Sequence, residues 1–228
     1  MKTLRLDKTQ YPFLIEDWGH TEYGEAFERQ KAYLRDRIDG ERRDTLVFTE
    51  HLPVFTTGAR IAADSHLIWD EEQLAKKGIA VYKSNRGGDI TYHGPNQLTA
   101  YLIFSLDKIR DLRVYLKLIE DMLIQITSEF GLKARRREGK TGIWIEKRKI
   151  AAIGIAVKSW VSYHGVALNV NNDLTAFQGI VPCGIVDGSV TSLRKELGFP
   201  VEMEKVKSIV SAAFNNTFRD YFTELDER

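Results

Sequence analysis

The residue with the clearest chemical potential is the single cysteine, Cys183, which stands in the run VPCGI. Pro182 fixes one backbone angle and has no amide hydrogen, and Gly184 lets the chain turn sharply, so we expect the sulfur to lie in a loop. A loop thiol is a nucleophile only as the thiolate, and a free thiol with a pKa of about 8.5 needs a cation or a base beside it. The alternative is a buried cysteine that behaves as a small hydrophobic residue.

Three side chains are candidates for the partner of this thiol. Lys149 opens the otherwise apolar run KIAAIGIAV, and a lysine at the edge of a dry environment can have a lowered pKa and act as a base. His93 and His164 each precede a glycine, in TYHG and SYHG. Lys149 is equally explained as one basic residue of the turn EKRK, and His164 as a hydrogen-bonded strand residue. The local sequence leaves the choice open.

The stretch RGGDITYHGPNQ (86–97) combines an arginine and a histidine with three glycines ahead of an apolar run. A simple turn would explain Gly87 and Gly88, but a second glycine-flanked histidine favours a loop whose backbone approaches a ligand closely. Arg86 and His93 would then fix a carbonyl or a phosphate. The sequence has no GxxxxGK[ST] and no GxGxxG, so no motif supports nucleotide binding.

The composition narrows the class of protein. The chain has 33 basic and 32 acidic residues, so no global field points to nucleic acid or to an anionic membrane. Its 228 residues, 43% of them hydrophobic, can bury a substantial core, and we expect one domain over 1–228. No run approaches eighteen apolar residues and no signal peptide is evident, which predicts a cytoplasmic protein without a membrane span. One cysteine excludes an internal disulfide or a cysteine metal site, and we expect no metal.

The elements that must position these residues alternate between helices and strands. Hydrophobic spacing predicts an α+β fold in which a mixed β-sheet is flanked by helices. The segment 51–60 reads as a loop, and Thr21 is a candidate cap for the first helix. The predicted helices are 21–38, 71–78 (closed by Gly78), 112–132 and 201–222, and the predicted strands are 45–50, 79–84, 97–106 and a three-stranded meander over 141–170 with turns at 146–148 and 158–160.

Four motifs, in order, resemble those of one family. They lie between Asn85 and Gly184 and are similar to segments of the lipoyl(octanoyl) transferases, the lipoate-protein ligase B family. The four motifs are RGGDITYHGPNQLTAY, KIAAIGIAV, SYHGVALNVNNDLTAF and the following PCG. The resemblance implies the fold shared by biotin and lipoate protein ligases, with Cys183 as the acyl-thioester nucleophile and Lys149 as the lysine that lowers the thiol pKa and acts as base. It implies His164 in a supporting role and, for the acyl substrate, three binding segments: Arg86, Gly87, Gly88, Asp89, Ile90, Thr91, Tyr92 and His93; Ala152, Ile153 and Gly154; and Gly165, Val166 and Ala167.

The implied reaction transfers an octanoyl group from octanoyl-acyl carrier protein to a lysine of lipoyl domains, those of 2-oxoacid dehydrogenases and of the glycine cleavage H protein. The acyl group passes from one thioester to another and then to an amide, so the resemblance implies no ATP and no cofactor. An ATP-dependent lipoate or biotin protein ligase on the same fold is the alternative enzyme. The alternative that is not an enzyme is a module that binds lipoyl domains without catalysing a reaction.

The basic stretch KARRREGK (133–140) is a candidate docking patch. Acidic carrier and lipoyl domains would be attracted to such a patch on a chain that is otherwise close to neutral. A solvated hairpin is the plainer interpretation.

Overall fold

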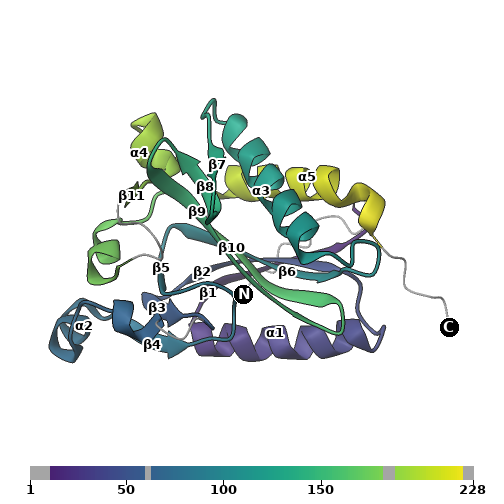
Figure 1. Cartoon of the computed structure of the whole chain (residues 1–228), viewed down its shortest axis with the longest axis horizontal. Coiled ribbons are helices and arrows are strands. Elements are labelled where there is room, and N and C mark those ends of the chain that lie inside the picture. The colour runs from purple at the N-terminus through teal and green to yellow at the C-terminus, as the bar shows by residue number, and fades with distance from the viewer. Residues whose placement is uncertain (1–10, 60–62, 182–187, 223–228) are drawn as a thin grey trace.

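The computed structural model describes residues 11–59, 63–181 and 188–222, and their architecture is α+β (Figure 1). Two sheets are formed. The strands of the larger sheet are β1 (Leu14–Thr21), β2 (Thr45–His51), β6 (Gln97–Ser105), β7 (Arg135–Arg137), β8 (Lys140–Ile145), β9 (Arg148–Lys158), β10 (Val161–Asn169) and β11 (Ser189–Val190). Those of the smaller sheet are β3 (Val54–Thr57), β4 (Ala80–Lys83) and β5 (Thr91–His93).

The larger sheet is mixed, as expected from the sequence. Its order is β1-β2-β6-β10-β9-β8-β7, with β11 beside β9. The pairs β1–β2 and β9–β11 are parallel, and the other pairs are antiparallel. The smaller sheet has the order β4-β3-β5. The segment between β5 and β6 therefore carries the chain from the small sheet into the centre of the large one.

Helices cover both faces of the large sheet (Figure 1). Two of them, α3 and α5, lie on one face and α1 lies on the other. No described helix is long and apolar enough to cross a membrane. The helices are α1 (Tyr23–Ile38), α2 (Glu71–Lys77), α3 (Leu112–Ser128), α4 (Leu193–Leu197) and α5 (Met203–Phe218), and the short 3-10 turns are η1 (Ala63–His66), η2 (Thr175–Gly179) and η3 (Arg219–Tyr221).

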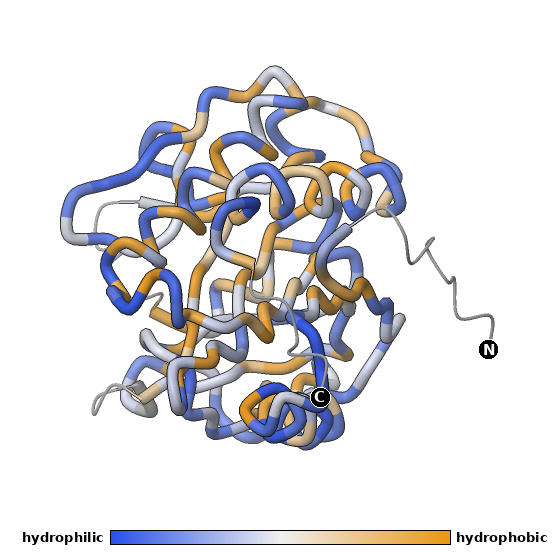
Figure 2. Tube along the Cα trace, turned by 90° about the vertical axis from the view of Figure 1, so that its right-hand side faces the viewer, coloured by the Kyte–Doolittle hydropathy of each residue, from blue (hydrophilic) through white to orange (hydrophobic). Residues whose placement is uncertain are grey.

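The main core lies between the large sheet and the helices α3 and α5. Strand β6 is buried along its whole length, as predicted for 97–106. Its alternation sends Leu98, Ala100 and Leu102 into the main core, whereas Tyr101 belongs to a separate cluster with Ala26 of α1. In Figure 2, hydrophobic segments are frequent in the interior of the molecule and hydrophilic ones at its periphery.

The meander and the closure of α2 confirm predictions made from the sequence. The turns that flank β9 contain residues in the left-handed conformation, Glu146 (φ 53°), Ser159 (φ 49°) and Trp160 (φ 57°), which suits tight two-residue hairpins. Gly78 ends α2 with φ 61° and donates its backbone N–H to the carbonyls of Leu74 and Ala75.

Two expectations were wrong. The segment 51–60 is not a loop throughout, because Val54–Thr57 form β3 and all four residues are buried. Flanking Pro53 and Gly58 obscured this short strand of β-branched and aromatic residues. The cap of α1 is Glu22, whose carboxylate accepts the N–H groups of Gly24 and Glu25. Thr21 instead ends β1, where its hydroxyl lies 2.6 Å from that of Thr49.

Candidate active site

A pocket of about 340 Å³ opens where β9 and β10 meet the loop that carries the RGGD motif. Its wall also includes the start of β8 and two leucines of α3. The lining residues outside the predicted substrate-binding set are Tyr23, Gln97, Thr99, Tyr101, Leu112, Leu116, Gly139, Lys140, Thr141, Lys149, Ala151, Ile155, His164, Asn169, Phe177 and Val190.

The pocket brings together nearly all residues that the sequence singled out. Every predicted substrate-binding residue lines it except Tyr92, and Lys149 and His164 line it as well. The ring of Tyr92 packs instead against Phe55 and Phe177, with centroid distances of 5.7 and 5.6 Å, beneath the small sheet. Cys183 lies outside the described residues.

The facing strands β9 and β10 leave room because their paired residues are small. Gly154 is paired with Gly165, and Ala152 with Ala167. Ile153 and Val166 alternate with these small residues along the strands and belong to the main core. Residues on both faces of β9 and β10 therefore contribute apolar atoms to the pocket wall.

Gly154 also allows the RGGD loop to pack directly on β9. A Cβ at this position would lie 2.9 Å from the carbonyl oxygen of Gly87 and 3.1 Å from Cδ of Arg86. The N–H of Gly87 donates to the carbonyl of Ile155 at 2.8 Å. Backbone contact of this closeness requires glycine, which explains the glycine in KIAAIGIAV.

Arg86 is buried and its guanidinium is held by protein oxygens. Its Nε donates to Oγ1 of Thr56 at 3.1 Å, its Nη2 to the Thr56 carbonyl at 2.5 Å, and its Nη1 to the Gly87 carbonyl at 3.2 Å. These bonds tie the RGGD loop to β3. That the same group contacts a substrate stays a prediction.

Two buried histidines lie close together: His93 lines the pocket, and His51, which is outside the described lining, packs against it with ring centroids 5.6 Å apart. Nδ1 of His93 lies 2.9 Å from Oε1 of Gln97, and Nε2 of His51 lies 2.5 Å from the hydroxyl of Tyr101. Burial lowers the pKa of His51 to about 4, and burial followed by the charges of His51 and Arg86 places that of His93 well below 6.5. Both rings are therefore neutral near pH 7.

His164 is also neutral, and its backbone departs from the regular strand. Its φ is 58°, its N–H donates to Oε1 of Gln30, and its Nε2 lies 2.8 Å from Oδ1 of Asn85. Burial, and then the charge of Arg86, lower its pKa to about 3. Because the conjugate acid is so strong, this imidazole is a weak base near neutral pH.

Lys149 lines the pocket from the start of β9. Its Nζ lies 5.4 Å from the centroid of the Trp144 ring, and a Cβ on Gly142 would come within 2.7 Å of its Cε. Strand β11 runs parallel to β9 with Val190 opposite Lys149, and the N–H of Thr191 donates to the Lys149 carbonyl at 2.9 Å. Residues 189–191, which come after Cys183 in the sequence, therefore lie directly beside Lys149.

Sequence reasoning missed several polar lining residues. Gln97, Thr99 and Tyr101 alternate along QLTAYLIFS, and this period of two, with polar residues on one face, was a usable signal. Tyr23 carries no comparable local signal. It reaches the site only through the packing of α1.

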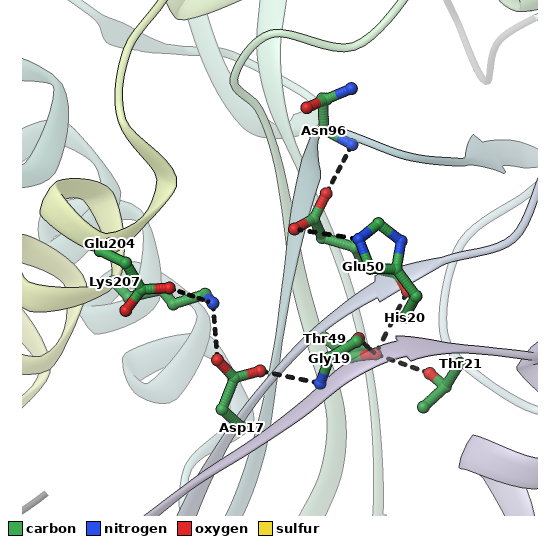
Figure 3. Close-up of polar contacts among 9 residues, drawn as sticks. All are labelled: Asp17, Gly19, His20, Thr21, Thr49, Glu50, Asn96, Glu204 and Lys207. Carbon is green, nitrogen blue, oxygen red and sulfur yellow. Dashed lines mark hydrogen bonds and ion pairs between the residues drawn. The ribbon is translucent and has the colours of Figure 1, made fainter. Parts of the chain in front are cut away.

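The turn between β5 and β6 is held by a carboxylate of β2, as Figure 3 shows. Asn96 of the HGPN segment has φ 62°, and its N–H donates to Oε2 of Glu50 at 2.7 Å. The other oxygen of Glu50 lies 3.9 Å from Nε2 of His20, an exposed side chain. In the same view, Nζ of Lys207 on α5 lies 2.6 Å from Asp17 of β1. The bond from Asn96 to Glu50 holds the chain between His93 and Gln97, whereas the Lys207–Asp17 pair joins α5 to β1.

The basic stretch 133–140 forms β7 and the turn into β8. Arg136 is bonded to the carboxylates of Glu120 and Asp121 on α3 at 2.8 and 2.6 Å, and Arg137 lies over the Trp144 ring. Lys133 and Arg135 are exposed. A role in docking stays a prediction, and it falls on these two residues.

Comparison with known families shows to which family the fold and the motifs belong. Residues 22–215 match the model of the lipoyl protein ligase A/B catalytic domain. The chain belongs to this family. The resemblance found in the sequence is therefore confirmed at the level of the family.

Relatives within the family are similar over most of both chains. An octanoyltransferase of Parabacteroides distasonis is 42% identical over 218 residues, which cover 90% of this chain and 98% of the relative. An octanoyltransferase of Rubrobacter xylanophilus is 43% identical over 203 residues, covering 89% and 91%.

Solved structures confirm the fold expected for this family. A bi-partite lipoate protein ligase of Thermoplasma acidophilum has a TM-score of 0.70 at 17% identity, over 92% of this chain and 84% of that one. Lipoate-protein ligase A bound with ATP has a TM-score of 0.71 at 17% identity, over 90% and 84%. The biotin protein ligase of Aquifex aeolicus is more distant, with a TM-score of 0.52 at 9% identity over 91% and 69%.

Proposed function

We propose that this protein is an octanoyltransferase, which moves an octanoyl group from a carrier-protein thioester to a lysine of a lipoyl domain. Relatives that are 42 and 43% identical over nearly their whole length carry the name octanoyltransferase. The proposed acceptor follows from the family, lipoyl protein ligase A/B, and from a structural neighbour described together with its E2 lipoyl domain. Octanoyl-acyl carrier protein is the proposed donor, and the reaction requires no cofactor.

One observation carries the mechanism. The chain leaving Cys183 pairs with β9 at Arg148 and Lys149, and Lys149 lines the same pocket as the RGGD loop. Cys183 stands six positions before Ser189, the first residue of β11, which pairs with the strand that carries Lys149. This supports the pairing of Cys183 with Lys149, which the sequence motifs implied.

The first half-reaction forms an acyl-enzyme. The Cys183 thiolate attacks the carbonyl carbon of the donor thioester, and the thiolate of the carrier leaves and takes a proton from the Lys149 ammonium. In the second half-reaction the amine of the acceptor lysine attacks the new thioester, the neutral Lys149 amine accepts its proton, and the Cys183 thiolate leaves. The product is an amide, so transfer is downhill without ATP.

The pocket suits an uncharged acyl chain. Its small residues on β9 and β10 leave space, and burial keeps the histidines 51, 93 and 164 neutral. The acyl chain would then leave water without facing additional positive charge, and each buried methylene contributes about 0.8 kcal/mol.

The direct test is the mass of the intact protein after mixing with octanoyl-acyl carrier protein. We expect an adduct of one octanoyl group that hydroxylamine removes and that Cys183→Ser does not form. Transfer to a lipoyl domain should then discharge it. Absence of an adduct from the parent chain would contradict the proposal.

Lys149 is tested by two substitutions. Lys149→Met removes both charge and base, and should lower transfer by a factor on the order of 10² or more. Lys149→Arg keeps the charge but cannot accept a proton, so the adduct should form and then persist in the presence of acceptor. Equal turnover of Lys149→Met and the parent would exclude the lysine as base.

An ATP-dependent ligase is the second candidate, because lipoate-protein ligase A bound with ATP shares the fold. Such an enzyme would attach free octanoate when given ATP and magnesium. We expect this chain to leave free octanoate unused under those conditions, whereas the carrier thioester supports transfer.

A further inference from the structure

One cation of the pocket has no part in the proposed reaction. The cationic side chains among the described lining residues are those of Arg86, Lys140 and Lys149. Arg86 is held by Thr56 and Gly87, and Lys149 is the proposed base. Lys140, the first residue of β8, is partly exposed and has no task in that scheme. A positive charge beside an acyl pocket suits a ligand that carries an anionic group next to its acyl chain.

Lys140 stands at the rim of the pocket. It lies in the turn between β7 and β8, and its neighbours on both sides are exposed and line the pocket. The pocket therefore reaches the surface beside this turn and the start of α3, and a ligand that extends out on this side passes Lys140. The exposed members of the described lining are Gly88, Leu112, Gly139 and Thr141.

The rim is close to the amine of Lys149. A Cβ on Gly142 would lie 2.7 Å from Cε and 3.4 Å from Nζ of Lys149, so the lysine side chain packs against this glycine. Lys140 precedes Gly142 by two positions along β8, which puts the two Cα atoms at most about 7 Å apart. One ligand can therefore place its reacting atom at Lys149 and an anionic group at Lys140.

Contacts with α3 hold this rim in place. The carboxylate of Glu120 accepts the N–H of Gly142 at 3.2 Å through Oε1, and accepts from Nε of Arg136 at 2.8 Å through Oε2. Nη2 of Arg136 also donates to the carbonyl of Lys117 at 2.8 Å. Both strands of the hairpin β7–β8 are thus tied to α3, and Lys140 is presented from a fixed backbone.

We propose that Lys140 binds the phosphate of the donor's prosthetic arm. An acyl carrier protein holds its acyl group as a thioester at one end of a pantetheine arm, and a phosphodiester joins the other end to the protein. With the acyl chain in the pocket and the thioester beside Lys149, the arm leads out over the rim and brings its negative charge to Lys140. A lysine ammonium binds phosphate as a compact point charge. This inference rests on the proposed function, because it takes the donor to be a carrier thioester.

The experiment compares two small donors that differ only in the phosphate, octanoyl-pantetheine and octanoyl-phosphopantetheine, with a lipoyl domain as acceptor. For the parent at low salt, kcat/KM should be about fivefold higher with the phosphorylated donor, and added salt should shrink this ratio. Lys140→Gln removes the charge and should bring the ratio close to one, whereas Lys140→Arg keeps the charge and should keep most of the ratio. Both donors are measured on the same preparation, so partial unfolding of a variant cancels.

Lys147→Gln is the matched control. Lys147 is exposed in the turn at the other end of β8 and lies outside the described pocket lining. The substitution removes the same charge from the same hairpin strand region, and the ratio should equal that of the parent.

Three results would overturn the inference: equal kcat/KM for the two donors with the parent, the parent ratio in Lys140→Gln, or an equal drop of the ratio in Lys147→Gln. If the small donors are equivalent while transfer from the whole carrier protein still depends on Lys140, the lysine contacts a carboxylate of the carrier and not the phosphate.

Failure of the proposed function looks different, because the parent then uses neither thioester. In that case the amide analogues of the two donors, in which nitrogen replaces the thioester sulfur, are titrated into the parent and Lys140→Gln. A preference in Kd for the phosphorylated analogue that is lost in Lys140→Gln supports the phosphate site without any transfer. Equal Kd values in the parent would overturn it.

Discussion

At the scale of single residues, burial decides which groups in the pocket and next to it are charged. The pKa values of His51, His93 and His164 are all lowered, with burial the largest cause each time. The cationic side chains among the described lining residues are then Arg86, Lys140 and Lys149. Arg86 is held by Thr56 and Gly87, so Lys149 is the better placed of these to act on the reacting thioester.

The buried histidines predict that stability falls in acid. The pKa of His164 is about 3 in the folded chain, against 6.5 ordinarily, so below pH 6.5 the unfolded chain binds a proton that the folded one refuses. Stability is then fully present above pH 6.5 and declines as the pH falls. His164→Gln should reduce this loss, with a slope that approaches about 1.4 kcal/mol per pH unit as the pH falls from 6.5 to 5. Urea unfolding at several pH values measures it.

The control for that experiment is His20→Gln, because His20 is exposed. It should leave the slope of stability against pH as it is in the parent. Equal slopes for the parent and for His164→Gln would show that His164 does not resist protonation in the folded state.

The small residues of β9 and β10 predict acyl-chain selectivity. Ala167 lines the pocket opposite Ala152, so Ala167→Val should displace part of the acyl chain. For each methylene that no longer fits, kcat/KM for octanoyl relative to hexanoyl donor should fall about fourfold, which corresponds to about 0.8 kcal/mol. Ala156→Val lies on β9 outside the pocket lining and should keep the parent ratio. A uniform loss for all donors in folded Ala167→Val would mean that this residue does not limit chain length.

At the scale of elements, the sequence predicted the helices and strands whose hydrophobic residues recur at regular spacing. The long helices, the buried strand β6 and the meander β8–β10 are fixed by local hydrophobic spacing and by tight turns. The small sheet was only partly predicted, since β3 is four residues long and is stabilised by pairing with β4 and β5, which lie 23 or more residues away. Such short strands are set by tertiary contacts that local propensity does not encode.

The hairpin β7–β8 predicts a salt-sensitive effect on docking. Reversing Lys133 and Arg135 to Glu leaves the bonds of Arg136 to α3 intact and changes the exposed charge by four units. KM for the carrier protein should rise severalfold at low salt, and the difference should shrink as salt screens the charges over about 10 Å. Steady-state kinetics at several salt concentrations measure this.

A matched reversal on α1, at exposed Lys31 and Arg35, makes the same change in net charge elsewhere. It should alter KM much less. If both double variants raise KM equally, the effect belongs to net charge and not to a docking patch on the hairpin.

At the scale of the whole molecule, the candidate site depends on segments that are far apart in the chain. Local sequence offered Cys183, Lys149 and the RGGD loop as separate possibilities, and only the family motifs joined them. The structure adds that β9, β10, β11 and the small sheet converge on one pocket. The participation of Tyr23 was beyond sequence reasoning, because it reaches the site only through the packing of α1.

The position of the pocket predicts that an acyl chain stabilises the small sheet. The small sheet has its own hydrophobic cluster around Phe55 and Tyr92, separate from the main core, and β5 contributes Thr91 and His93 to the pocket wall. A bound octanoyl chain would bridge β5 and the strands β9 and β10. In the octanoyl adduct of Lys149→Arg, amide hydrogen exchange in β3 and β5 should slow by about tenfold or more, since burying even two methylene groups contributes about 1.6 kcal/mol. Exchange in α5, which packs in the main core, should stay unchanged.

The same variant alkylated with iodoacetamide is the control, because alkylation modifies the same sulfur without adding a long chain. Equal exchange in the octanoylated and alkylated proteins would show that the acyl chain does not lie against the small sheet.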